Sequence, residues 1–313
     1  MSGSPADPTK TGKVMVGMPL YNEEETVGSM VHIAKKYTDN VICVDDGSSD
    51  NSSRIAENCG AEVHYHRVNR GYGGALKTLF SIARKKDVDV LVVMDSDGQH
   101  NPDDIPKLIE PIFSGEADMV IGSRFVSKEG ETEMPVYRKL GIKVITTASN
   151  LSSNLNIKDT QSGYRAFSRE ALNKLRFESE GMELSIEMLD DADEKNIVVK
   201  EVPTKMRYDV PKGSNFTAIS HGFTVFSYAL ISLSQKKPIL VLGIPGLGFL
   251  ATGTAMGLRA INGVSDYTNV TVGPGITAAW VGVIGISLIF AGVMLQSARS
   301  ILKRLILRDF SIE

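Results

Sequence analysis

The chain has 313 residues, a formal net charge of −3 and a mean hydropathy of −0.04. This length admits one large domain or two smaller ones, and the slightly acidic balance gives no reason to expect nucleic acid as a partner. The two cysteines, Cys43 and Cys59, exclude a disulfide framework and a cysteine-rich zinc site. The mean hydropathy conceals an asymmetry, because a charged first two-thirds precedes a very apolar last quarter.

Residues 1–13 are small and polar and lack the apolar core of a signal peptide, so we expect a cytosolic, disordered N-terminus. Short apolar runs then alternate with helical patterns. The runs typical of strands are residues 14–20, 41–44, 61–66 and 88–94, and the helical patterns between them end near Tyr37, Asn58 and Lys86. This alternation predicts βαβ units and therefore an α/β fold with a doubly wound, mostly parallel sheet.

Acidic residues follow three of these predicted strands. Glu23 comes after the first, Asp46 after the second, and Asp95 and Asp97 after the fourth. Because the carboxyl ends of parallel strands meet at one edge of a sheet, we expect these side chains to converge there. Two carboxylates with Gln99 beside them suit Mg²⁺ or Mn²⁺ shared with a diphosphate. A single acidic turn would be unremarkable, since Asp favours turns, but three at one edge indicate a site for a polar ligand and a metal.

Three glycines, Gly71, Gly73 and Gly74, stand at the start of the helix that precedes the fourth strand. Glycines there would let a ligand approach the backbone closely. Their spacing is not that of a dinucleotide-binding fingerprint, and the chain contains no P-loop motif. These facts argue against a dinucleotide-dependent oxidoreductase and a P-loop nucleotidase.

The next part of the chain has a second polar region. A predicted strand at residues 119–121 leads to Arg124, and a cluster of polar residues occupies 159–165. A helix begins at Ser168 or Arg169, another covers residues 180–194, and a strand covers 197–202. In the second helix, Glu183 and Glu187 are spaced i, i+4, so they either face the site or form a solvated acidic face.

The last quarter of the chain indicates a membrane anchor. Residues 213–236 form an amphipathic pattern, either a core-packing helix or, in this position, an interfacial helix that includes His221. Residues 237–298 then predict a transmembrane hairpin, with spans at about 238–258 and 275–296. Basic residues flank both outer ends, and the basic, amphipathic tail of residues 299–313 suits anionic lipid. We therefore predict a multi-pass protein of the cell membrane with its catalytic part, residues 14–212, in the cytoplasm.

Four motifs in residues 14–212 together resemble the family 2 glycosyltransferases, and among those the archaeal dolichol-phosphate sugar synthases. They are Pro19-x-Tyr-Asn-Glu23, Asp45-Asp46-Gly-Ser, Asp95-x-Asp97-Gly-Gln99-His and Asp159-x-Gln-Ser-Gly-Tyr-Arg165. The resemblance implies a GT-A fold, a nucleotide-sugar donor and a polyprenyl phosphate acceptor. The Gln-x-x-Arg-Trp motif of processive members is absent from the sequence, and the only tryptophan, Trp280, lies in a predicted span.

The resemblance also assigns roles to individual residues. The nucleotide-sugar site would contain Pro19, Tyr21, Glu23, Asp46, Gly74 and Asp95, and the metal would be held by Asp95, Asp97 and Gln99. The acceptor phosphate or the diphosphate would meet Arg124, Gln161, Arg165, Arg207 and Lys212. Asp97, Arg124 and Arg165 would be the catalytic residues.

The sequence therefore predicts an inverting, metal-dependent glycosyltransferase that moves a monosaccharide to dolichyl or polyprenyl phosphate, for protein glycosylation or cell-surface glycans. The 161–165 region favours UDP-glucose or UDP-N-acetylglucosamine as the donor, with GDP-mannose as the rival. One alternative is transfer to a lipid-linked or protein-bound sugar, which would need a base such as Asp97 or Glu183. Another is a non-catalytic partner that binds lipid or nucleotide sugar. The oligomeric state stays open.

Overall fold

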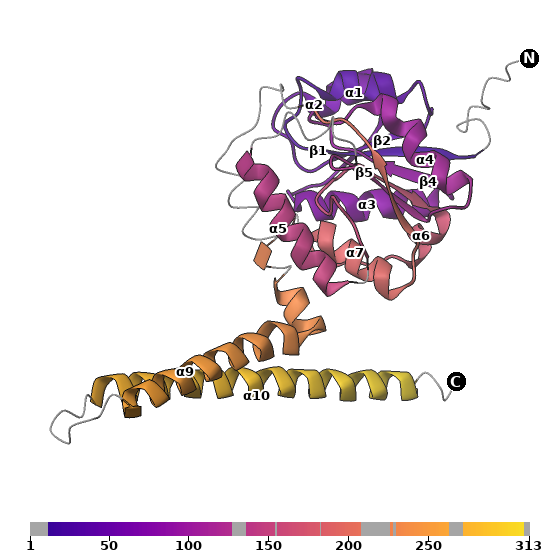
Figure 1. Cartoon of the computed structure of the whole chain (residues 1–313). Helices are drawn as coiled ribbons and strands as arrows, with labels where there is room; N and C mark the ends of the chain where they lie inside the picture. Colours follow the sequence, from indigo (N-terminus) through magenta and orange to yellow (C-terminus); the bar gives the residue numbers. More distant parts are fainter. Residues whose placement is uncertain are drawn as a thin grey trace, which may run out of the picture. The chain divides into compact units, whose positions relative to one another are not determined.

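The computed structural model describes residues 12–126, 136–153, 155–181, 183–207, 226–227, 230–262 and 272–309. The chain divides into two compact units, Met1–Ala229 and Leu230–Glu313. The first unit contains a β-sheet with helices on both sides, and the second contains two long helices (Figure 1). Lys212, His221 and most of the predicted interfacial helix lie outside the described residues.

The sheet of the first unit has seven strands in the order β3-β2-β1-β4-β6-β5-β7. Their bounds are β1 Val14–Leu20, β2 Val41–Asp45, β3 Glu62–Tyr65, β4 Val90–Val93, β5 Met119–Ser123, β6 Arg165–Ser168 and β7 Val199–Pro203. All neighbouring pairs are parallel except those that β6 makes with β4 and β5. The predicted mostly parallel, doubly wound sheet is therefore confirmed.

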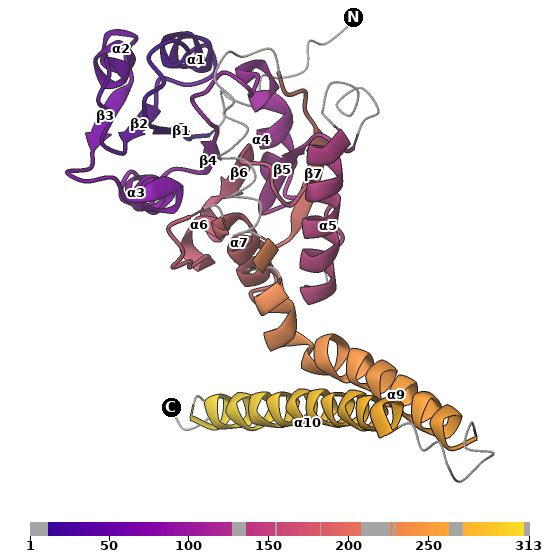
Figure 2. The ribbon, with the colours of Figure 1, turned by 90° about the vertical axis from the view of Figure 1, so that its left-hand side faces the viewer.

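Helices cover both faces of this sheet, as Figure 2 shows with the sheet seen along its edge. One face packs against α1 (Val27–Ala34), α2 (Ser52–Asn58) and α4 (Ile105–Phe113), and the other against α3 (Gly71–Lys85), α6 (Arg169–Lys174) and α7 (Leu184–Glu194). A short 3₁₀ helix, η2 (Pro102–Asp104), precedes α4, and α5 (Val136–Ser152) lies between β5 and β6.

The strands separate the two cores because alternate side chains point to opposite faces. In β4, Leu91 and Val93 belong to the core beneath α3, whereas Val90 and Val92 belong to the core beneath α1 and α4. Both faces are buried, so the strand is a continuous apolar run rather than an alternating pattern. The carboxyl ends of β1, β2 and β4 therefore share one edge of the sheet.

The sequence pattern does not predict strand β6, because residues 159–165 form a polar cluster and the next helix is expected to begin at Ser168 or Arg169. Its antiparallel register pairs Arg165 with Val93 of β4 and with Ile121 of β5. The start of β6 therefore lies where β4 and β5 end. The polar segment before β6 reaches the same edge as the carboxylates after β4, although its strand runs in the opposite direction.

The second unit consists of a π-helical turn, η3 (Ile239–Gly243), followed by α9 (Ile244–Asn262) and α10 (Val272–Asp309). Among the described residues, two stretches are long and apolar enough to cross a membrane, Ile239–Ile261 and Gly273–Arg299. These coincide with the two predicted spans. Helix α10 continues without a break to Asp309, so the predicted basic tail begins inside this helix.

Glycines let α9 and α10 approach each other closely. A Cβ on Gly253 would lie 2.6 Å from the backbone nitrogen of Gly282, and a Cβ on Gly285 would lie 2.5 Å from that of Leu250. Such distances leave no room for a side chain, because the obstacle is backbone. Small residues at a helix crossing are the usual way to pack apolar helices in lipid, where the hydrophobic effect does not draw them together.

Replacing Gly253 with leucine should therefore separate the two helices. We expect a loss of about 1–3 kcal/mol of helix-pair stability, since the new side chain meets backbone that cannot turn away. Thermal melting in detergent, followed by circular dichroism, measures this loss. Gly248→Leu is the matched control on the same helix, because a Cβ there meets nothing within 4 Å. Equal melting of the two variants would contradict the close crossing.

Candidate functional site

A cavity of about 430 Å³ opens at the edge of the sheet where β1, β2 and β4 end. This volume lies within the range of small-molecule sites. Its walls come from the ends of these strands, the start of α3, and the segments before β6 and α7. The lining residues are Pro19, Leu20, Tyr21, Glu23, Asp46, Asn69, Gly71, Tyr72, Ala75, Asp95, Ser96, Asp97, Gln161, Gly163, Gly181 and Ser185.

Seven of the predicted site residues line this cavity. They are Pro19, Tyr21, Glu23, Asp46, Asp95, Asp97 and Gln161. Gly74, Gln99, Arg124, Arg165 and Arg207 are not among the lining residues that the structure describes. The convergence predicted from the three acidic strand ends is therefore present, and the roles assigned to the residues outside the lining stay predictions.

The loop that carries Asp95 and Asp97 is held by hydrogen bonds from several elements. The Ser96 hydroxyl donates to the carbonyl of Pro19, at 2.7 Å between oxygens, and the Ser96 carbonyl accepts from the Thr26 hydroxyl, also at 2.7 Å. The backbone nitrogen of Gln99 donates to Asp97 Oδ1 at 2.9 Å. Gln99 thus orients Asp97 through its main chain, and the role of its side chain as a metal ligand stays a prediction.

His100 supports the same loop from inside the protein. Its ring is buried and stacks on Tyr164 with 4.9 Å between ring centroids. Burial lowers the pKa of His100 to about 4, so the ring is neutral and Nδ1 accepts from the backbone nitrogen of Asp95 at 3.1 Å. This contact fixes the direction in which the Asp95 carboxylate leaves the strand.

Asp95 lines the cavity, and neighbouring groups offset only part of the effect of burial on its pKa. Burial raises the pKa of Asp95 to about 6, while a hydrogen bond from Tyr72 and the positive charges of Arg124 and Arg165 lower it. Burial also raises the pKa of Tyr72 well above its ordinary value, so that hydroxyl keeps its proton and donates. Tyr72 is not among the residues predicted from the sequence. The only signal was its place between two glycines at the start of a helix.

The donor set suits a divalent cation shared with a phosphate ligand. Asp95 and Asp97 offer hard oxygens to one cavity, and the Asp95 side chain is 31 % exposed there. Within the described part of the chain, no group of three or more His, Cys, Asp or Glu side chains could enclose a metal. Mg²⁺ commonly takes only one or two carboxylates and completes its coordination with water and substrate phosphates. The residues present therefore fit such a cation.

The glycines in the first turn of α3 serve packing in this structure. Gly71 has a φ of +75°, and a Cβ on Gly73 would lie 2.4 Å from the carbonyl oxygen of Ser179. The segment at Ser179 is held in turn by Glu187, whose carboxylate accepts from the backbone nitrogens of Glu178 and Ser179 at 2.7 and 2.9 Å. Glycine here therefore lets one wall of the cavity pack directly on α3.

Arg124 forms a buried ion pair with Asp159. Its Nε and Nη2 each lie 2.6 Å from a carboxylate oxygen of Asp159, which is fully buried. The Asp159 backbone nitrogen donates to Glu201 at 2.9 Å. The predicted contact of Arg124 with a phosphate therefore competes, in this structure, with a bidentate internal partner.

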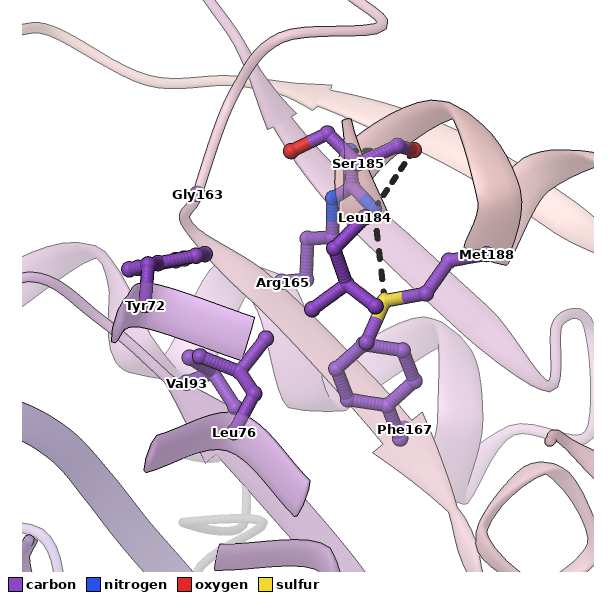
Figure 3. A pocket seen from close by; sticks show the side chains of 9 residues that line it. All are labelled: Tyr72, Leu76, Val93, Gly163, Arg165, Phe167, Leu184, Ser185 and Met188. Carbon is purple, nitrogen blue, oxygen red and sulfur yellow. Dashed lines mark hydrogen bonds between the residues drawn. The ribbon is translucent and has the colours of Figure 1, made fainter. Parts of the chain in front are cut away.

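Arg165 is buried behind the cavity. Its guanidinium donates to the carbonyl oxygens of Thr160, Ser162 and Ser185 at 2.8–3.2 Å. Figure 3 shows it beside Ser185 and Met188, at a gap of about 10 Å³ that is too small for a substrate. Arg165 thus fixes the segment that carries Gln161 and Gly163, which do line the cavity.

A model of the family described as "Glycosyl transferase family 2" matches residues 15–176, which include the carboxylate loop and the 159–165 segment. The chain belongs to glycosyl transferase family 2. It is 32 % identical over 240 residues to UDP-N-acetylglucosamine–dolichyl-phosphate N-acetylglucosaminyltransferase of Methanococcus voltae, covering 70 % of this chain and 95 % of that one. It is 32 % identical over 212 residues to polyprenol monophosphomannose synthase of Mycolicibacterium smegmatis, covering 64 % and 79 %.

A solved structure shares the fold of this glycosyltransferase. Glucosyl-3-phosphoglycerate synthase of Mycobacterium tuberculosis, in complex with Mn²⁺ and UDP-glucose, superposes with a TM-score of 0.57 at 22 % identity. The alignment covers 72 % of this chain and 81 % of that one. The GT-A fold that the sequence resemblance implied is therefore confirmed.

Proposed function

We propose that this glycosyltransferase moves a monosaccharide from a nucleotide sugar to a dolichyl or polyprenyl phosphate, with inversion at the anomeric carbon. The observation that carries the proposal is a cavity with paired carboxylates in a chain that also has two helices able to cross a membrane. A long lipid acceptor stays in the membrane, so a membrane anchor on the same chain would keep the catalytic unit near it. The printed names of two relatives, one archaeal and one bacterial, support an acceptor of this class.

The chemistry of such an acceptor fits the residues of the cavity. A phosphate monoester has a second pKa of about 6, so it is largely dianionic at neutral pH and nucleophilic without a general base. A divalent cation bound at Asp95 and Asp97 would stabilise the negative charge that develops on the departing diphosphate. The chain's own part is to hold these carboxylates in place through Ser96, His100 and Tyr72.

The identity of the nucleotide-sugar donor is the more specific part of the proposal. We favour UDP-glucose or UDP-N-acetylglucosamine, with GDP-mannose as the rival. The two relatives differ in the sugar that their names print, so they support the acceptor class more strongly than any one donor.

Purified full-length protein with Mn²⁺, dolichyl phosphate and a panel of UDP- and GDP-sugars is expected to yield one lipid-linked monosaccharide. Thin-layer chromatography of the organic phase, with a radiolabelled donor, measures the product. Dolichol without its phosphate is the matched acceptor control, and it should give none because it lacks the dianion. Absence of product with every donor, together with transfer to a sugar acceptor, would favour the alternative enzyme, for which Asp97 or Glu183 would have to act as a base.

A further inference from the structure

Asp46, which lines the cavity, belongs to a hydrogen-bonded chain of three side chains that continues through His66 to Thr78. The register of β2 and β3 pairs Asp45 with Tyr65, which brings the next residues, Asp46 and His66, together. His66 Nδ1 lies 2.7 Å from Asp46 Oδ1, and its Nε2 lies 2.8 Å from the Thr78 hydroxyl on α3. The side chains of His66 and Asp46 are nearly buried, with 8 % and 6 % of their surface exposed.

The roles in this chain follow from hydrogen-bond capacity. An ionised carboxylate can only accept a hydrogen bond, so Nδ1 of His66 must carry the proton and donate the hydrogen bond to Asp46. Thr78 is itself anchored, because its hydroxyl lies 3.2 Å from the Gly74 carbonyl within α3. The imidazole is therefore held at both nitrogens, and its ring cannot turn away from Asp46.

The two oxygens of Asp46 differ as a result. Oδ1 accepts from His66 and also from the backbone nitrogen of Arg70, at 2.8 Å. The hydrogen bonds that the described residues make to the Asp46 side chain both end on Oδ1, and Asp46 lines the cavity. Asp46 therefore presents one acceptor atom to a ligand, at an orientation set from behind.

We propose that His66, held by Thr78, is a positioning residue that makes Asp46 a single-oxygen acceptor and thereby selects a uracil over a guanine nucleotide. The inference deepens the proposed function by naming the base of its donor. The pairing edge of uracil has one N–H, flanked by carbonyls, and one oxygen satisfies it. The guanine edge has two adjacent N–H groups, which match a carboxylate that can use both oxygens. In this structure Oδ1 of Asp46 already accepts from His66 and from Arg70, so only Oδ2 is left for the base.

Three variants of full-length protein test this, with UDP and GDP binding measured by calorimetry in Mg²⁺ and no acceptor lipid. His66→Leu should weaken UDP binding about tenfold, since the carboxylate loses its donor and its orientation. His66→Asn should stay within about threefold of wild type, because its amide nitrogen can replace Nδ1. His64→Leu is the matched control on β3, where His64 pairs only with exposed Glu62 in the described contacts.

The expected result is UDP preference in wild type, a smaller preference in His66→Leu, and recovery in His66→Asn. The proposal would be overturned if His66→Leu bound UDP as tightly as wild type does. It would also be overturned if His66→Asn bound UDP as weakly as His66→Leu while the two variants melted at the same temperature. Wild type that binds GDP as tightly as UDP would overturn the choice of base. Because no acceptor is present, these outcomes are independent of whether a lipid phosphate receives the sugar.

Discussion

Replacing Asp97 with asparagine is expected to abolish sugar transfer and to leave the catalytic unit folded. Asparagine keeps an oxygen that can accept from the Gln99 backbone nitrogen, now at 2.9 Å, but it loses the charge that a divalent cation requires. A loss of about 4 kcal/mol of transition-state stabilisation corresponds to a rate about a thousandfold lower. Turnover at saturating donor, together with Mn²⁺ binding followed by electron paramagnetic resonance, measures both effects.

The matched control is Asp103→Asn, farther along the same connection. Asp103 is exposed and its Oδ1 accepts from the Tyr37 hydroxyl at 2.7 Å. We expect this variant to turn over and bind Mn²⁺ as wild type does. Wild-type turnover in Asp97→Asn would remove the metal assignment, and equal losses in both variants would mean that the loop as a whole is sensitive to substitution.

The largest effect on stability is expected from Asp159→Ala. This change leaves the Arg124 guanidinium buried without the carboxylate that lies 2.6 Å away, and breaking a buried pair in this way costs about 3–5 kcal/mol. It also removes the side-chain contact between the 159–165 segment and the end of β5, while the Asp159 backbone nitrogen can still donate to Glu201 of β7. Thermal melting of the full-length protein in detergent measures the loss.

Glu116→Ala supplies the matched comparison for this prediction. Glu116 pairs with Lys200 at 2.8 Å, but the two side chains are 58 % and 45 % exposed, and solvent-exposed pairs contribute about 0–1 kcal/mol. A small stability loss in Asp159→Ala, combined with weaker UDP binding, would contradict the structural role. It would support instead the direct phosphate contact predicted for Arg124 from the sequence.

The strands that carry the site were predictable because each is a run of buried apolar residues that ends in polar ones. Residues 14–20 were predicted as a strand with the bounds that β1 has, and the ends of β2 and β4 agree within a few residues. The convergence of Glu23, Asp46 and Asp95 then followed from parallel pairing alone. No tertiary information was needed for that step.

Other features depend on contacts that a linear pattern does not contain. Strand β6 begins with Arg165 and ends with Ser168, so it lacks the apolar composition of a core strand. Helices α4 and α5 were also not predicted. A hidden signal existed for His66, because residues that follow adjacent parallel strands are neighbours, and the order of β2 and β3 would have placed it beside Asp46.

The antiparallel direction of β6 has a dynamic consequence. The chain leaves the sheet at the end of β5 and returns to the same edge before β6. The Arg124–Asp159 ion pair joins the two ends of this connection. Helix α5 inside it rests on a small cluster, Ile145, Ala148 and Ile186, separate from the two cores of the sheet. We expect α5 to open by breaking this small cluster while the seven strands stay paired. The amide hydrogens of α5 should therefore exchange ahead of those in the sheet.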